Sequence, residues 1–157
     1  MNRRLNLTKI FFVLLVSCSS LFAGERFVSL GSGETNYVSY GLSCLVSDSR
    51  SASPLPPGKD LVLTLRNDGA KLIRFGNITT TNFSLRDANG QKMDVYLRSS
   101  TEDVVITYGM PTVIQLEVTT RGAPQPWTLH FHSQSGPYHD PFDLTITGIK
   151  PPSSPRK

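Results

Sequence analysis

The chain has 157 residues, with 16 Lys and Arg, 12 Asp and Glu, and a formal net charge of +4. Three of the basic residues, Arg3, Arg4 and Lys9, lie at the amino terminus, and the rest of the chain carries 13 basic against 12 acidic residues. A nearly neutral chain lacks the clustered positive charge that nucleic-acid binding requires, so this class of partner is excluded.

Length and cysteine content indicate one domain that does not depend on disulfides. The chain is long enough to bury a core of its own without metals or crosslinks as staples. Its two cysteines, Cys18 and Cys44, provide no disulfide framework. Cys44 lies in an alternating apolar run and is expected to be a small core residue.

The amino terminus has the three-part layout of a secretory signal peptide over residues 1–23. A basic start is followed by the apolar run Ile10–Val16 and then by small residues up to Ala23. The apolar run is too short to cross a bilayer as a helix. Cleavage after Ala23 would release a soluble exported protein beginning at Gly24.

A second processing site overlaps the end of this signal. Leu15-Val16-Ser17-Cys18 resembles the lipobox of bacterial lipoproteins, in which the cysteine becomes the lipidated first residue. The resemblance implies lipidation of Cys18, and Ser19 after it implies retention in an outer membrane. The two processing sites leave two localisations open: free in the periplasm, or lipid-anchored at the outer membrane.

Short strands with turn signals between them are expected after the signal. Residues 24–36 are a leading segment that forms either an edge strand or a tether, and 37–46 alternate as a complete strand. Residues 47–58 form an exposed Ser- and Pro-rich loop containing Pro54 and Pro56, which cannot donate to a strand ladder.

The middle and end of the chain continue the same pattern. Leu61–Arg66 ends at Asn67-Asp68-Gly69, a hairpin signal, and Asn89-Gly90 marks a second turn. Gly109-Met110-Pro111 is expected to turn a hairpin into the strand 113–118. The other expected strands are 72–78, 83–86, 93–97, 104–108, 127–131 and 142–146, and residues 150–157 are expected to be a disordered tail.

This spacing, with no helical period, predicts an all-β fold: an antiparallel β-sandwich of about eight or nine strands over residues 37–149. The motifs L-T-L-R-N-D-G and F-S-L-R-D-A-N-G-Q, with the Gly-Pro turn before residue 113, resemble immunoglobulin-like sandwiches of exported bacterial proteins. The chain departs from antibody-type domains because it lacks their paired cysteines.

A His-x-His pair is the strongest candidate for a metal site. His130 and His132 alternate with apolar residues on one strand, so both project from the same face and can ligate one ion. His139 is the expected third ligand, and Asp140 and Asp143 also follow within reach. The pair is therefore expected to lie on an ordinary solvated strand face, and a zinc or copper site is the alternative.

No catalytic signature occurs in the sequence, and we expect a protein that is not an enzyme. Loops on a rigid sandwich commonly carry binding, so Tyr138, His139 and Asp140 in one loop and Pro54 and Pro56 in another are the predicted partner-binding residues. The expected function is a non-catalytic exported binding module of the bacterial cell envelope, for a protein or envelope component and without a cofactor. The alternative is a periplasmic metal-binding protein.

Overall fold

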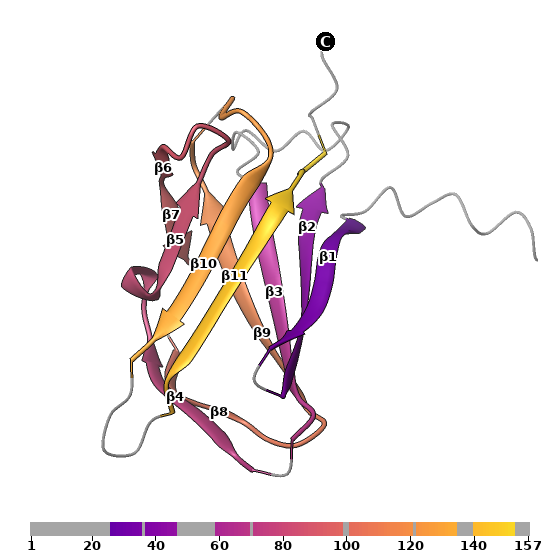
Figure 1. Cartoon of the computed structure of the whole chain (residues 1–157), viewed down its shortest axis with the longest axis vertical. Helices are drawn as coiled ribbons and strands as arrows, with labels where there is room; N and C mark the ends of the chain where they lie inside the picture. The colour runs from indigo at the N-terminus through magenta and orange to yellow at the C-terminus, as the bar shows by residue number, and fades with distance from the viewer. Residues whose placement is uncertain are drawn as a thin grey trace, which may run out of the picture.

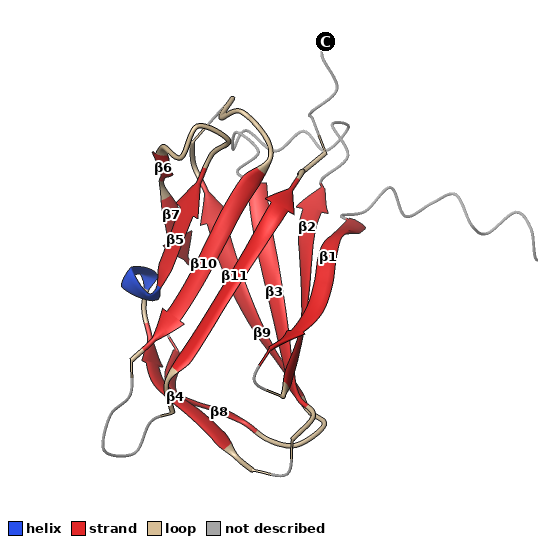
Figure 2. Cartoon of the chain, viewed as in Figure 1, coloured by secondary structure: helices blue, strands red, loops and turns tan. Residues whose placement is uncertain are grey.

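Strands make up most of the chain that is described (Figures 1 and 2). The computed structural model describes residues 26–35, 37–46, 59–69, 71–98, 101–120, 122–134 and 140–152. The elements are β1 (Arg26–Thr35), β2 (Val38–Val46), β3 (Lys59–Asn67), β4 (Ile73–Ile78), the 3-10 helix η1 (Thr80–Asn82), β5 (Phe83–Arg86), β6 (Lys92–Met93), β7 (Val95–Leu97), β8 (Thr101–Ile106), β9 (Pro111–Val118), β10 (Trp127–Ser133) and β11 (Phe142–Ile149). Within these ranges no helix is long and apolar enough to cross a membrane.

Two antiparallel sheets face each other across one apolar core, which confirms the predicted all-β sandwich. One sheet has five strands in the order β1-β2-β3-β9-β7, and the other has four in the order β11-β10-β5-β6 (Figure 1). The finer assignment to the immunoglobulin-like class stays a prediction. The largest fully buried side chains include Trp127, Phe131, Leu42, Leu61, Leu63, Leu65 and Leu85.

The core follows the alternation of the sequence because successive side chains on a strand point to opposite faces. Leu61 and Leu63 on β3 pair with Leu116 and Ile114 on β9, and all four are buried. Cys44 pairs with Leu61 from the other side and is only 2% exposed. The predicted core position of Cys44 is thus confirmed.

A two-stranded sheet, β4 with β8, closes one end of this core at the foot of the molecule in Figure 1. The Phe75 ring on β4 meets the rings of Phe131 and Phe142 edge-on, with centroids 5.7 and 4.9 Å apart. Such edge-to-face pairs add to the free energy gained from burial. The short sheet is therefore part of the core rather than a surface appendage.

The prediction of one strand over 93–97 is wrong, because the chain changes sheets inside it. Met93 on β6 pairs with Leu85 in one sheet, whereas Val95 on β7 pairs with Val118 in the other. Both side chains are buried, so the alternation of apolar residues persists while the hydrogen-bonding partners change. With this division and with β1, the described residues form eleven strands instead of eight or nine.

Two of the three predicted hairpins are also wrong. β3 pairs with β2 and β9, whereas β4 pairs only with β8, so Asn67-Asp68-Gly69 links different sheets. The turn at 109–111 likewise joins β8 to β9, which do not pair. The turn at Asn89-Gly90 does close a hairpin, between β5 and β6.

Both ends of the sandwich extend beyond the predicted limits. Arg26–Thr35 pairs along β2 and forms an edge strand, the first of the two possibilities for the leading segment. At the other end, Pro151 is buried and its carbonyl accepts a hydrogen bond of 2.9 Å from Gln125 Nε2, so residues 150–152 are not part of a disordered tail. The signal peptide, the Cys18 motif and residues 153–157 lie outside the described residues.

Truncation of Leu63 is expected to lower the free energy of unfolding by about 2 to 5 kcal/mol, because Leu63→Ala removes apolar contacts and leaves a cavity in the core. Val113→Ala is the matched control, since Val113 is exposed on the neighbouring strand β9. It should cost less than about 1 kcal/mol. Urea denaturation of both variants measures the difference, and equal losses would contradict the placement of β3 in the core.

Candidate functional site

At one end of the sandwich, three connections (β1–β2, β3–β4 and β8–β9) are held by Asp68 and by the buried residue Asn67. The Asn67 Nδ2 donates to the carbonyls of Lys71 at 2.6 Å and Ile106 at 3.1 Å, and its Oδ1 accepts from the N–H of Gly69 at 2.9 Å. Its backbone carbonyl accepts from the Gly109 N–H at 2.9 Å. Asn67 is fully buried, so these bonds form without competition from water.

The bond from Gly69 to the Asn67 side chain explains why the predicted hairpin does not form. An Asn side chain that accepts from the backbone two residues ahead makes an Asx turn, which redirects the chain by itself. Here the turn sends the chain away from β3 toward β4. Asn-Asp-Gly is therefore a link between sheets.

The turn from β1 to β2 is held at the same end. Asp68, next to Asn67, donates its N–H to the carbonyl of Tyr37 at 2.9 Å. Tyr37 has a φ of +63°, a left-handed conformation that is uncommon for any residue other than Gly, Asn or Asp. A Cβ at Gly69 would lie 3.1 Å from the Tyr37 Cβ, so a glycine at position 69 leaves room for this tyrosine.

The carboxylate of Asp68 is fixed beside this turn. Hydrogen bonds from the Ser39 hydroxyl and, at 2.8 Å, from Arg66 Nε hold the pKa of the Asp68 carboxyl below its usual value. Both partners favour the charged form. Asp68 therefore stays ionised at neutral pH and ties Ser39 of β2 to Arg66 of β3 on the outside of the sheet.

These connections expose four large apolar side chains, which we call the end patch: Tyr37, Leu72, Tyr108 and Met110. They are between 54% and 75% exposed. Each belongs to, or directly follows, a segment that is bonded to Asn67 or Asp68. Exposed apolar groups that are held by a rigid frame are typical of an interaction surface.

The sequence pattern does not single out the end patch, because it predicts Tyr37 and Tyr108 at strand ends and Met110 in a turn. A usable signal was present at Tyr37, which is out of phase with the buried positions Val38, Leu42 and Cys44 and therefore has no inward place to occupy.

His130 and His132 lie as predicted on one outward face of β10, and the structure brings Asp143 of β11 to them. His130 Nε2 lies 3.0 Å from Asp143 Oδ1, and His132 Nδ1 lies 3.5 Å from Asp143 Oδ2. The two imidazole rings are stacked with centroids 5.9 Å apart. We call these three residues the histidine cluster.

The predicted partner-binding residues are mostly outside the described part of the chain, which leaves out Pro54, Pro56, Tyr138 and His139. Asp140 is described, and it is bonded to Arg74 at the start of β4. Asp140 Oδ2 accepts from the Arg74 N–H at 3.1 Å, and the Asp140 N–H donates to the Arg74 carbonyl at 2.8 Å. Asp140, just before β11, is thus tied to the backbone of β4.

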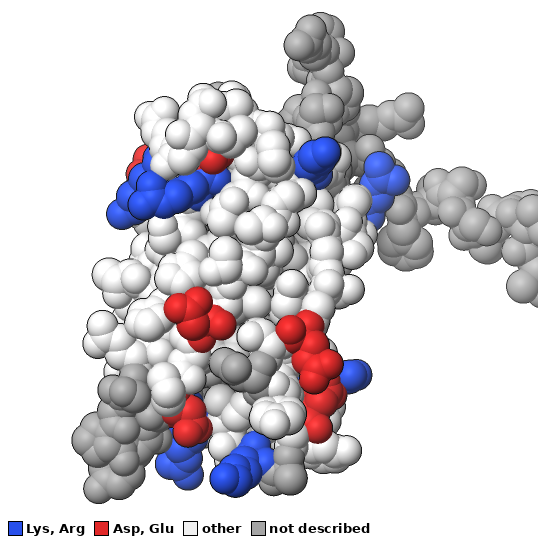
Figure 3. Space-filling view, viewed as in Figure 1, with Lys and Arg blue, Asp and Glu red and all other residues white. Residues whose placement is uncertain are grey.

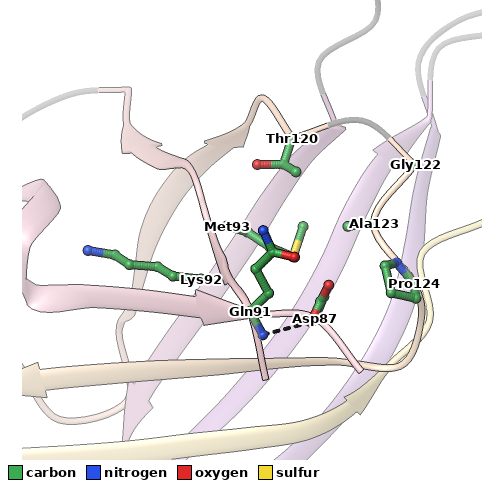
Figure 4. Close-up of a pocket in the computed structure, with 8 residues that line it drawn as sticks. All are labelled: Asp87, Gln91, Lys92, Met93, Thr120, Gly122, Ala123 and Pro124. Atoms are coloured by element: carbon green, nitrogen blue, oxygen red, sulfur yellow. Dashed lines mark hydrogen bonds between the residues drawn. The ribbon is translucent and has the colours of Figure 1, made fainter. Parts of the chain in front are cut away.

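The described residues line hollows on the surface, among them a larger and a smaller one. The larger, of about 480 Å³, is a polar groove beside the histidine cluster, where the lining side chains include Asn77, Thr79, Thr81, Asn82, His132 and Gln134. The smaller, of about 250 Å³, lies beside the β5–β6 turn (Figure 4). There the Asp87 carboxylate already accepts the N–H groups of Asn89 and Gln91, so its charge stabilises the turn.

Comparison of the chain with models of known protein families, with curated proteins and with solved structures gives no significant match.

Replacement of Asn67 by alanine is expected to destabilise the protein by about 3 kcal/mol or more, because each buried partner left unpaired costs roughly 1 to 3 kcal/mol. Three backbone groups would lose the Asn67 side chain. Gln115→Ala, which removes an exposed amide on β9, is the control and should change the free energy of unfolding by less than about 1 kcal/mol. Chemical denaturation compares them, and similar effects would show that the Asn67 amide is not a structural anchor.

Proposed function

We propose that this protein is a non-catalytic, exported β-sandwich of the bacterial cell envelope that binds a protein partner through the end patch. The observation that carries the proposal is the frame around Asn67 and Asp68, which holds three connections so that Tyr37, Leu72, Tyr108 and Met110 face solvent. Large apolar side chains exposed in this way cost solubility unless they are covered by a partner.

The composition of the end patch favours a protein as the partner. Tyrosine and methionine are enriched in protein interfaces, and tyrosine is among the residues that contribute most binding energy. Arg66, Asp68 and Lys71 stand next to the patch and would supply a polar rim of both signs. An apolar centre with a mixed polar rim is the usual anatomy of a protein interface.

The distribution of charge favours neither nucleic acid nor direct attachment to an anionic membrane. On the face shown in Figure 3, Lys and Arg form separate groups divided by uncharged surface and by acidic groups. Polyanions are bound by continuous stripes of basic side chains. Contact with a membrane would then come from a lipid on Cys18 rather than from the sandwich itself.

The conformation of Tyr37 adds support. A turn position with positive φ is usually occupied by glycine or asparagine, since the left-handed region costs other residues of order 1 kcal/mol or more. The chain keeps a tyrosine there, and 75% of it is exposed. A role of the exposed Tyr37 side chain in binding accounts for a tyrosine at a position where its backbone conformation is unfavourable.

Photo-crosslinking in the source cells tests this proposal. A photoreactive phenylalanine analogue at position 37 or 108 should give crosslinks to one and the same envelope protein. The same analogue at Tyr96, an exposed tyrosine on the outer face of β7, is the control and should not capture that protein. The same product from position 96, or none from 37 and 108, would overturn the proposal.

The Tyr37→Gly variant separates binding from folding. Glycine accepts the positive φ, so the free energy of unfolding should change by no more than about 1 kcal/mol. Loss of an exposed interface tyrosine should still weaken the captured complex by about ten-fold or more. Tyr96→Ala should leave that affinity unchanged.

Export and anchoring have a separate test at the amino terminus. If Cys18 is lipidated, the protein partitions with membranes and becomes soluble on Cys18→Ala, because acyl chains contribute about 0.8 kcal/mol per buried methylene. Mass spectrometry of the processed protein identifies its first residue. A soluble wild-type protein that begins at Gly24 would assign it to the periplasm without an anchor.

A further inference from the structure

We propose that the histidine cluster, His130, His132 and Asp143, is a binding site for a divalent transition-metal ion of the zinc and copper class. The site lies on the outer face of the four-stranded sheet and shares no residue with the end patch. It therefore goes beyond the proposed binding of a protein partner.

The strand pairing brings the three ligands together. His130 and His132 are two residues apart on β10, so their side chains leave the same face of the sheet. Asp143 stands directly opposite His132 in the register of β10 and β11, and it is diagonal to His130. The carboxylate thus reaches both rings, with one oxygen toward each.

The distances suit a metal ion after small side-chain movements. One ligand atom from each residue can be chosen so that all three lie within 4.8 Å of one another. Ligands bound to zinc at about 2.0 to 2.2 Å in a tetrahedron are about 3.4 Å apart. The two N···O distances of 3.0 and 3.5 Å already bracket this separation.

The donor atoms define the class of ion. Two imidazole nitrogens with one carboxylate oxygen are the ligands of zinc, copper and similar metals, whereas calcium and magnesium prefer sets made of oxygen alone. The single carboxylate also compensates part of the charge of a divalent ion. Magnesium and calcium are therefore poor candidates for this cluster.

The backbone beneath the cluster is fixed, which limits the cost of ordering the ligands. Leu129 and Phe131, which alternate with the two histidines, are fully buried, and so is the Ser133 side chain, whose hydroxyl donates to the Phe75 carbonyl at 3.0 Å. The carbonyl of His132 accepts from Asn82 Nδ2 at 2.9 Å. Binding then requires only rotation of three exposed side chains.

Three protein ligands leave at least one coordination position of the ion open. Zinc sites of this kind hold water or a second ligand in the fourth position. The histidines are 41% and 47% exposed in their side chains, so the open position faces solvent. The polar groove of about 480 Å³ begins at His132 and would place amide and hydroxyl groups next to a ligand of the metal.

This assignment changes one ligand of the sequence-based site. The sequence placed His139 third, and His139 lies outside the described residues. Asp143 fills that role here because the antiparallel register sets it opposite His132. Asp140, the other carboxylate considered, is bonded to the backbone of Arg74.

Calorimetric titration of the exported, processed protein with Zn²⁺ tests the proposal. We expect one equivalent to bind, and each of His130→Ala, His132→Ala and Asp143→Asn to weaken the affinity at least about ten-fold, because even outer-shell changes cost this much. Asp143→Asn keeps the size of the side chain, and Asp143 is exposed, so the fold should persist.

His139→Ala and Thr145→Ala are the matched controls. Thr145 stands opposite His130 on β11 and is exposed. Both variants should keep the wild-type affinity. An unchanged affinity in Asp143→Asn, a loss in His139→Ala, or the absence of stoichiometric binding would overturn the assignment. Because none of these variants touches Tyr37 or Tyr108, their crosslinks separate failure of the metal site from failure of the end patch.

Discussion

One face of each of the strands β3, β9, β10 and β11 is buried, and the rest of the architecture follows from this burial. Two sheets share a single apolar core. Side chains that alternate with core residues along a strand therefore point away from the core. Moving a strand by one residue would exchange the two faces, so the register is strongly specified. Leu129 and Phe131 alternate with His130 and His132 along β10 and are buried. The two histidines therefore face outward together, and their rings stack.

The chain must also pass between sheets at the ends of the sandwich. There the strands end, and backbone groups no longer have a neighbouring strand as hydrogen-bond partner. Buried backbone groups need hydrogen bonds, and at one end the fully buried Asn67 supplies several of them. Asn67 is tolerated in the apolar core because its side-chain amide forms hydrogen bonds with backbone groups. Backbone hydrogen bonds from Asp68 to Tyr37 and from Gly109 to Asn67 hold the segments that carry the exposed Tyr37 and Tyr108.

The end patch and the histidine cluster use the rigid sandwich in different ways. The end patch is built on connections, whose positions are fixed by Asn67 and Asp68. The histidine cluster is built on two paired strands, where the register alone sets the distances between the ligands. The proposed protein-binding surface and the proposed metal site share no residue, so neither proposal excludes the other.

The sequence by itself determined the fold class, the core residues and the common face of His130 and His132, because a period of two is a local property of each strand. Tertiary structure decided which strands pair. It divided residues 93–97 between two sheets, since Met93 and Val95 remain buried whichever partners they take. It also turned Asn67-Asp68-Gly69 from a hairpin into a link between sheets, because a buried side chain can bond to segments distant in sequence, such as Ile106. The meeting of Asp143 with His132 depends on antiparallel register, which no local pattern encodes.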